Sequence, residues 1–206
     1  GGAGRLNFIT VHPTNPTTMW GGAPGGGLWK TTDGGTSWTS NTDQLAQVIG
    51  CTDLAINPSN PNTMYLATGD AYGGDTYSVG LLKSTDGGTT WNTTGLSFGL
   101  PQYKQIGKVL IDPTSTSTLY AATTGGVYKS TDAGVTFTLS LAGSFKDIEF
   151  KPGTPQTLYV CGNEFHYTND GGTNWTKVTN VLPAAVDCQR MAIAVSAATP
   201  NTVYLV

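Results

Sequence analysis

One eight-residue motif occurs four times in this chain of 206 residues. Each copy begins with Ser or Thr, has Asp at its third position and Gly at its fifth, and ends with Trp or Phe. A motif that recurs at intervals predicts a row of similar structural units. We call these motifs the Asp turns; they are Thr31–Trp38, Ser84–Trp91, Ser130–Phe137 and Thr168–Trp175.

A second landmark recurs upstream of each Asp turn. A proline ends an apolar run, and an aromatic residue follows seven positions later. The residues two and four positions before the landmark are always apolar, which is the period of a strand. The landmark pairs are Pro13 and Trp20, Pro58 and Tyr65, Pro113 and Tyr120, Pro152 and Tyr159, and, with alanine in place of proline, Ala197 and Tyr204.

These landmarks predict four strands in each unit. Two strands flank the proline turn, a third precedes the Asp turn, and a fourth begins at its Trp or Phe. Four-stranded antiparallel units of about 40 to 50 residues are typical of β-propeller blades. We therefore expect an all-β chain, residues 1–206, with blades at about 5–49, 50–104, 105–143 and 144–187 and an incomplete fifth blade at 188–206.

The composition of the Asp turns indicates a structural role. The Asp can accept backbone hydrogen bonds, the Gly can adopt positive φ, and the aromatic ring can pack on a neighbouring sheet. Four such turns lie at separate points of the rim, so we do not expect them to form one catalytic or metal site. The residues concerned are Asp33, Gly35, Trp38, Asp86, Gly88, Trp91, Asp132, Gly134, Phe137, Asp170, Gly172 and Trp175.

Charge and composition exclude several classes of partner. The net charge is −3 without a basic run, which argues against nucleic acid and anionic membranes. No segment approaches the roughly 18 apolar residues of a transmembrane helix. Only 11 % of residues are charged, and Thr, Gly and Asn are abundant, which favours a secreted or cell-surface protein over a cytosolic repeat protein. We expect no cofactor.

The three cysteines lack metal-type spacing, so no zinc site is expected. Cys161 and Cys188 fall near the same edge of adjacent units and are the candidate disulfide. The alternative is that the thiols are free and buried.

The whole repeat resembles the Asp-box (BNR) propellers, in particular those of the sortilin or vacuolar-protein-sorting type. The segments Gly4–Asn7 and His12–Pro16 resemble, in sequence, secreted bacterial proteins that use the type-nine secretion pathway. That resemblance implies secretion or surface-anchoring machinery as a partner. The superfamily contains enzymes, sorting receptors and assembly factors, so its fold does not fix a function.

Four and a half blades cannot close a ring, because an open ring leaves strand edges and apolar faces uncovered. We therefore expect the remainder of the ring to lie outside this chain.

The repeat also resembles propellers of xyloglucan-degrading and sialic-acid-cleaving hydrolases. Sialidases need three arginines, and this chain has only Arg5 and Arg190. The resemblance to xyloglucanases places Pro24 where their catalytic Asp would be, and proline cannot transfer a proton.

Two segments opposite the Asp turns depart from the repeat. The loop 68–80 is longer than its counterparts and carries Asp70, Tyr72, Asp75 and Tyr77, which can form a binding or interface loop, a calcium site, a glycosidase pair or a solvated loop. The connection 92–105 carries Phe98 and Tyr103, which either recognise a ligand or fill the gap between blades.

These observations favour a secreted, non-catalytic recognition or adhesion propeller over an enzyme. We expect a glycan or protein ligand on the face opposite the Asp turns, with Asp70, Tyr72, Asp75, Tyr77 and Tyr103 as ligand-binding candidates and no metal. The alternative is a glycoside hydrolase whose catalytic carboxylates lie partly outside this chain. A third class, an intracellular assembly factor, would have reduced cysteines.

Overall fold

The computed structural model describes residues 4–45, 49–180, 182, 184, 187–188 and 190–206. Within these ranges the chain forms four four-stranded antiparallel sheets and one two-stranded sheet. The predicted all-β propeller fold is confirmed. A short 3-10 helix, η1 (Leu100–Gln102), lies in the connection between the second and third sheets. No helix in the described part of the chain is long and apolar enough to cross a membrane.

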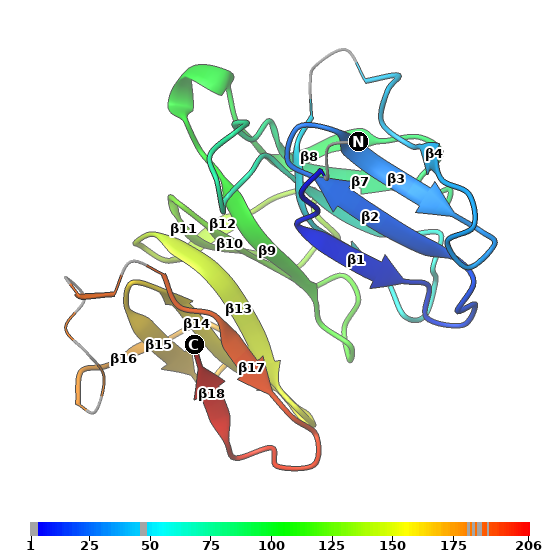
Figure 1. Ribbon diagram of the computed structural model, residues 1–206. Helices are drawn as coiled ribbons and strands as arrows, with labels where there is room; N and C mark the ends of the chain where they lie inside the picture. Colours follow the sequence, from blue (N-terminus) through cyan, green and yellow to red (C-terminus); the bar gives the residue numbers. More distant parts are fainter. Residues whose placement is uncertain (1–3, 46–48, 181, 183, 185–186, 189) are drawn as a thin grey trace.

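Each sheet is a meander whose strands follow chain order (Figure 1). The first sheet holds β1 (Phe8–Val11), β2 (Met19–Ala23), β3 (Gly27–Thr31) and β4 (Thr39–Ser40). The second holds β5 (Cys51–Ile56), β6 (Met64–Thr68), β7 (Gly80–Ser84) and β8 (Asn92–Ser97). The third holds β9 (Ile106–Ile111), β10 (Leu119–Thr123), β11 (Gly126–Ser130) and β12 (Thr138–Leu141).

The fourth sheet holds β13 (Phe145–Lys151), β14 (Thr154–Gly162), β15 (Phe165–Thr168) and β16 (Thr176–Val178), and the fifth holds β17 (Ile193–Val195) and β18 (Val203–Leu205). Each fourth strand begins one residue after the Trp or Phe at which it was predicted to begin. In the first sheet this is because the ring belongs to the turn: Trp38 Nε1 donates to the carbonyl of Gly35 at 3.2 Å.

The sheets converge on their first strands. β1, β5, β9, β13 and β17 pack against one another in sequence, while the fourth strands lie at the outer rim. Polar side chains join these inner strands: Asn7 Nδ2 donates to the Cys51 carbonyl at 3.0 Å, and the Ile193 amide donates to Asp147 Oδ2 at 2.7 Å. The radial arrangement predicted from the repeats is therefore present.

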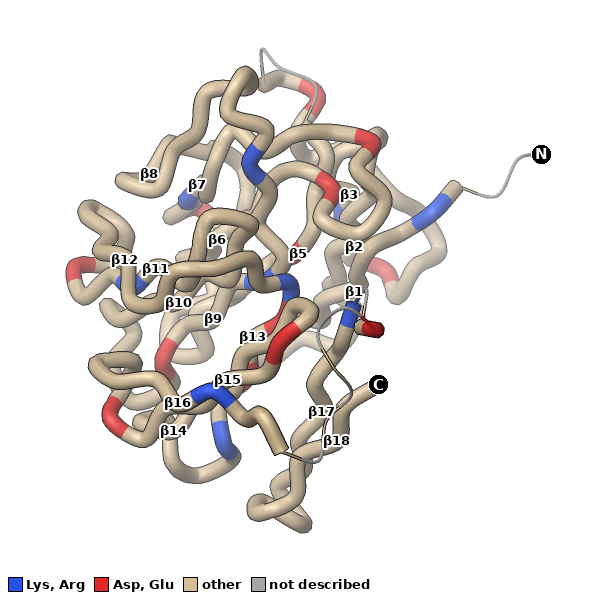
Figure 2. Tube along the Cα trace, turned by 90° about the vertical axis from the view of Figure 1, so that its left-hand side faces the viewer, with Lys and Arg blue, Asp and Glu red and all other residues tan. Residues whose placement is uncertain are grey.

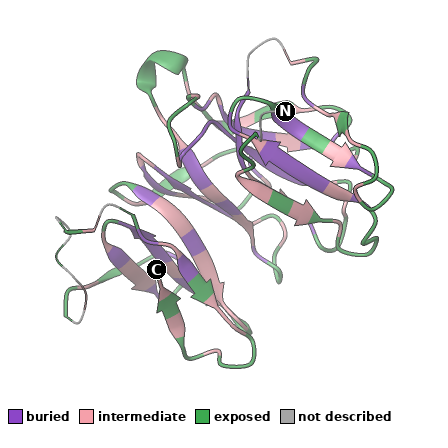
Figure 3. Ribbon diagram, in the orientation of Figure 1, coloured by how far each residue is buried: buried purple, intermediate pink, exposed green. Residues whose placement is uncertain are grey.

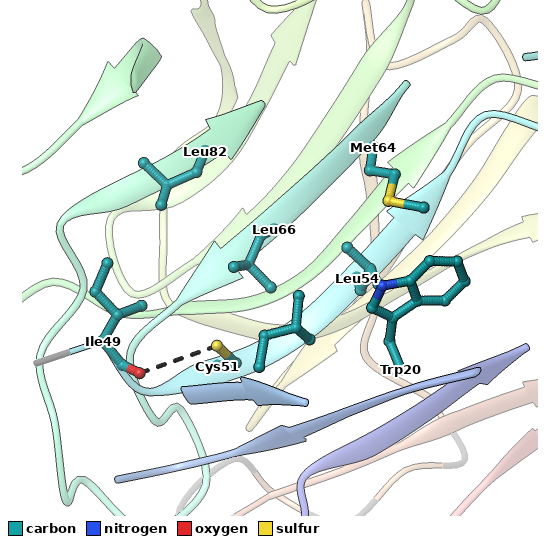
Figure 4. Close-up of a cluster of buried hydrophobic side chains, with 8 residues drawn as sticks. Trp20, Ile49, Cys51, Leu54, Met64, Leu66 and Leu82 are labelled. Carbon is teal, nitrogen blue, oxygen red and sulfur yellow. Dashed lines mark hydrogen bonds between the residues drawn. The ribbon is translucent and has the colours of Figure 1, made fainter. Parts of the chain in front are cut away.

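The core consists of separate apolar clusters, each between two successive sheets. The cluster between the first and second sheets includes Trp20, Leu54 and Leu66, all at most 3 % exposed (Figure 4). The central strands of the sheets are the most buried parts of the chain (Figure 3). Burying one such side chain contributes about 1.5–3 kcal/mol, so these clusters hold adjacent sheets together.

A repeated polar contact supplements this packing. Lys83 Nζ and the Tyr65 hydroxyl of the second sheet both donate, at 2.9 Å, to the Ala133 carbonyl in the Asp turn of the third sheet. Lys129 and Tyr120 make the same pair of bonds to the Gly171 carbonyl of the fourth sheet. The second and third sheets thereby each hold the Asp turn of the next sheet.

Candidate functional site

The four Asp turns share one hydrogen-bond pattern. In the turn of the second sheet, Asp86 Oδ1 accepts the Thr90 amide at 2.9 Å and Asp86 Oδ2 accepts the Thr90 hydroxyl at 2.6 Å. Gly88 has φ of +86°, which a residue with a Cβ adopts only with strain. The rings of Trp91, Phe137 and Trp175 pack on the clusters between sheets. Both oxygens of each carboxylate accept hydrogen bonds within their own turn.

The hydrogen bonds also lower the pKa values of the four aspartates. The pKa of Asp33, Asp86 and Asp132 falls to about 2, chiefly because side-chain hydroxyls donate to the carboxylate, and in Asp170 the backbone of Asn174 is the main donor. The carboxylates are therefore stabilised in their charged form.

The role of the first residue in each turn was missed in the sequence. Ser84 is fully buried, its hydroxyl accepts the Gly88 amide at 2.9 Å, and it donates to Asp86 Oδ1 at 2.8 Å. A small hydroxyl residue is needed there because no larger side chain could reach both groups within the turn. The recurrence of Ser or Thr at this position was the available signal.

The Asp turns and the proline turns lie at the same end of the sheets. In each sheet the Asp turn donates a backbone hydrogen bond to the proline turn, as from Gly87 to the Asn62 carbonyl at 3.0 Å. The loop 69–79 and the connection 98–105 lie at the opposite end, where the Ser78 amide donates to the Lys104 carbonyl at 3.0 Å. This opposite end is called the loop face below.

Asp70 organises the long loop of the second sheet. Its side chain is 0 % exposed, and it accepts the amides of Tyr72, Gly73 and Asp75 at 3.1–3.2 Å. It also accepts hydrogen bonds from Arg5 and Asn7, which precede β1. A Cβ at Gly73 would lie 2.5–2.8 Å from the Arg5 guanidinium and Asp70 Oδ2, so a larger residue there would displace these side chains.

These donors leave Asp70 no oxygen for a ligand. Burial alone would raise the pKa of Asp70, but the amides of Asp75, Gly73 and Tyr72 and the Arg5 guanidinium together hold it below its ordinary value. Asp75 differs, because its side chain is 64 % exposed and only its Oδ2 pairs with Arg5, at 3.2 Å. Of the two predicted carboxylates, only Asp75 is accessible.

Tyr77 and Tyr103 come together on the loop face. Their ring centroids lie 4.8 Å apart with an interplanar angle of 68°, and the residues are 42 % and 64 % exposed. Phe98 instead packs against the cluster between the second and third sheets, as the gap-filling alternative predicted. The two segments that the sequence singled out thus meet through their tyrosines.

Tyr72 points elsewhere. The Arg190 guanidinium carbon lies 4.2 Å from the centroid of its ring, which joins the loop of the second sheet to the segment before β17. Burial raises the pKa of Tyr72, with smaller contributions from Asp53 and Asp147 on the inner strands. Tyr72 is therefore directed toward the inner strands.

A charged cluster on the inner strands was not predicted. Lys108 on β9 pairs with Asp147, at 3.0 Å, and with Glu149, both on β13. Asp53 on β5 accepts the Val109 amide at 2.9 Å, and burial raises its pKa to about 6. The signal was positional, since Asp53, Lys108 and Asp147 each stand five residues before the landmark proline and directly after a β-bulge.

The remaining predictions concern the cysteines and metal binding. All three thiols are free, and the predicted Cys161–Cys188 bond is not formed: Cys161 is buried, and its thiol donates to the Met191 carbonyl at 3.2 Å. Among the described residues, no three His, Cys, Asp or Glu side chains gather as a metal site requires. Charged residues are spread along the trace (Figure 2).

A hollow of about 580 Å³ lies at the rim, between Lys30 and Asn41 of the first sheet and Trp91 of the second.

Comparison with known proteins identifies relatives of one kind. The chain is 30 % identical over 181 residues to a xyloglucanase of Acetivibrio thermocellus, covering 82 % of this chain and 20 % of that protein. It is also 30 % identical over 149 residues to a xyloglucanase of Hypocrea jecorina, covering 66 % of this chain and 18 % of the relative. The chain thus spans about a fifth of the length of these relatives. No family model matches.

Solved structures support the fold. An ancestral GH74 enzyme superposes with a TM-score of 0.77 and 22 % identity over 98 % of this chain and 29 % of the other. The GH74 enzyme of Niastella koreensis has a TM-score of 0.68 and 24 % identity, and the match covers 100 % of this chain and 33 % of the other. YCF48 from Cyanidioschyzon merolae has a TM-score of 0.62 and 18 % identity, and the match covers 93 % of this chain and 60 % of the other. At these identities the likeness establishes the propeller fold alone.

The relatives correct the functional interpretation. The main prediction, a non-catalytic recognition or adhesion module rather than an enzyme, is wrong, because the sequence relatives are xyloglucanases. They favour the alternative, a glycoside hydrolase. The error arose from Pro24: the absence of one carboxylate from one loop was extended to the function of the whole protein.

Proposed function

We propose that this chain is part of a glycoside hydrolase that acts on xyloglucan, and that its loop face contributes to glycan binding. The observation that carries the proposal is the similarity to xyloglucanases over 82 % of the chain. The exposed tyrosines and Asp75 on the loop face support it, because aromatic rings with neighbouring hydrogen-bond acceptors suit sugar ligands.

We propose that the catalytic carboxylates lie partly outside this chain. Glycoside hydrolysis needs two carboxyl groups that both reach the scissile bond. On the loop face Asp70 is enclosed by five donors, and Pro24 is buried with its carbonyl accepting the Thr76 hydroxyl at 2.7 Å. Neither can serve as acid or base, which leaves Asp75 as the accessible carboxylate of this loop.

Further sheets are proposed to complete the ring. Ile9 on β1 is 59 % exposed, whereas the residues at the same repeat position in the other sheets are 0–6 % exposed: Leu54, Val109, Ile148 and Ile193. In those sheets the position is covered by the preceding sheet. Because this apolar position is buried in four of the five sheets, its exposure in the first sheet supports a further sheet packed against β1. The four Asp turns would then lie at the rim of an Asp-box propeller.

Release of reducing ends from xyloglucan by the intact protein tests the proposed activity. Unsubstituted cellulose derivatives and mannan serve as comparison substrates. We expect the protein to release sugar from xyloglucan. A protein that binds xyloglucan but releases no sugar over prolonged incubation contradicts the hydrolase proposal.

We also propose that the protein is exported by the type-nine pathway and is secreted or located at the cell surface. Both proposals rest on the resemblance of the repeat. Fractionation of the producing cells tests them. Detection of the intact protein only in the cytoplasm would exclude both.

A further inference from the structure

Two exposed tyrosines from separate loops form a corner on the loop face. Tyr77 belongs to the loop between β6 and β7, and Tyr103 to the connection between β8 and β9. Their rings stand edge to face, 4.8 Å apart at 68°. Isolated exposed aromatic residues are ordinary, but two that meet from different loops make a continuous apolar surface with a defined shape.

The backbone on both sides of this corner is held in place. The Ser78 amide, next to Tyr77, donates to the carbonyl of Lys104, next to Tyr103, at 3.0 Å. On the other side of Tyr77, the Thr76 hydroxyl donates to the Pro24 carbonyl of the first sheet at 2.7 Å. The relative position of the two rings is therefore determined by the backbone and does not depend on the rings alone.

Tyr103 is also held in an unfavourable conformation. Its φ of 53° lies in the left-handed region, which is strained for a residue with a Cβ. The Tyr103 amide donates to the Leu100 carbonyl at 3.1 Å, which closes the turn of η1. Glycine would serve the turn better, so the presence of a large exposed ring there points to a role for the ring.

The surroundings select the chemistry of the ligand. Asp75 has a 64 % exposed carboxylate two residues before Tyr77, and its Oδ2 alone pairs with Arg5. A pyranose has an apolar C–H face that can stack on a ring and hydroxyls that can donate to a carboxylate. A stable protein partner would need about 1,200–2,000 Å² of total buried surface, far more than two tyrosine rings supply.

We propose that Tyr77 and Tyr103 form a stacking site for a pyranose unit of a β-glucan chain, and that Asp75 accepts hydrogen bonds from its hydroxyls. This inference rests on the proposed function and specifies where on this chain the glycan binds. The ion pair between Arg5 and Asp70 holds the loop that carries Tyr77 and Asp75. Asp70 itself is fully buried and does not contact the ligand.

Calorimetric titration of the intact protein with xyloglucan and cello-oligosaccharides tests the site. Tyr77→Ala and Tyr103→Ala should each weaken affinity about three- to tenfold, the range expected from loss of one aromatic contact. Tyr77→Phe and Tyr103→Phe retain the rings and should bind nearly as the wild type does. Leu139→Ala removes an apolar side chain of similar exposure, 52 %, from the outer strand β12 and is the control.

The outcomes separate this proposal from the proposed activity. Unchanged glycan affinity in both alanine variants, with sugar release from xyloglucan retained, overturns the stacking site and leaves the hydrolase proposal standing. Weakened affinity in a protein that releases no sugar supports the site and contradicts the hydrolase. Unchanged glycan affinity together with altered self-association in sedimentation would identify the corner as a protein contact and overturn the glycan site.

Tyr103→Gly tests whether misfolding, and not loss of the ring, explains weaker glycan binding by Tyr103→Ala. It removes the ring and relieves the backbone, so it should bind as weakly as Tyr103→Ala while being at least as stable. An affinity equal to that of the wild type in this variant would overturn the role of the ring.

Discussion

Position 133 carries alanine where the other three Asp turns carry glycine. Ala133 has φ of 57°, and Gly34, Gly87 and Gly171 have φ of 66–72° at the equivalent position. The left-handed conformation costs alanine about 1–2 kcal/mol, whereas glycine adopts it freely but loses more backbone entropy on folding. The same backbone thus accepts both residues at different free-energy cost.

Ala133→Gly should therefore raise the free energy of unfolding by about 1 kcal/mol, measured by urea denaturation. Gly34→Ala is the reverse change at a site where the added Cβ meets no atom within 4 Å, so it should lower stability by a similar amount. Equal stability of wild type and both variants would contradict the strain assigned to this position.

Acid should weaken the Asp turns through their carboxylates. The pKa of Asp86 is about 2 in the folded chain, below its ordinary value of 3.8. Its ionised form stabilises the fold above pH about 4, and this contribution is lost as the pH falls toward 2, because the unfolded chain binds the proton first.

Asp86→Asn should accordingly reduce the fall in unfolding free energy between pH 5 and pH 2.5. Comparing the slope of stability against pH removes the constant effect of altered turn hydrogen bonds. Identical slopes in variant and wild type would show that the turn carboxylate is not linked to folding.

At the scale of elements, successive sheets are joined by a tyrosine and a lysine that converge on one carbonyl. The Tyr120 hydroxyl donates to the Gly171 carbonyl at 2.9 Å in a buried position, and Lys129 Nζ donates to the same oxygen at 2.7 Å. Trp20 holds the tyrosine position in the first sheet, and its Nε1 has no hydrogen-bond partner among the described residues. The first junction therefore lacks one of the bonds present in the next two.

Tyr120→Phe should lower the free energy of unfolding by about 1 kcal/mol, the usual net value of one hydrogen bond. Tyr128→Phe, on β11 of the same sheet, is the control, since Tyr128 is half-buried and its hydroxyl makes no hydrogen bond to the described residues. A loss in the control as large as in Tyr120→Phe would mean that the ring environment, not the bond to Gly171, sets stability there.

At the scale of the whole molecule, the apolar face of the first sheet distinguishes an open arc from a closed ring. Leu54, at the Ile9 position of the second sheet, is 3 % exposed against 59 % for Ile9. The two residues therefore differ in burial only through the presence of a preceding sheet.

In the intact protein, Ile9→Ser should lower the free energy of unfolding by about 2–4 kcal/mol, close to the effect of Val109→Ser in the same assay. A loss below about 0.5 kcal/mol, typical of a surface substitution, would mean that no further sheet covers β1.

The strands, their order and the Asp turns were predictable because their determinants are local. Alternating apolar residues, a proline at a fixed interval and a Ser/Thr-x-Asp-x-Gly segment each act within about ten residues, so four copies reinforce one another. Repetition concealed the function for the same reason: the repeated spacing reports on the fold, whereas the proposed glycan site lies on the loops that differ between sheets.

Only the tertiary structure decided how those loops meet. Arg5 and Asp70 are 65 residues apart, and their pairing encloses a carboxylate that the sequence presented as a ligand. Tyr77 and Tyr103 meet where the Ser78 amide donates to the Lys104 carbonyl and joins two loops from different parts of the chain. The thiol of Cys161 reaches the Met191 carbonyl and not Cys188. Contacts between sheets depend on the packing angle of whole elements, which no short segment of sequence determines.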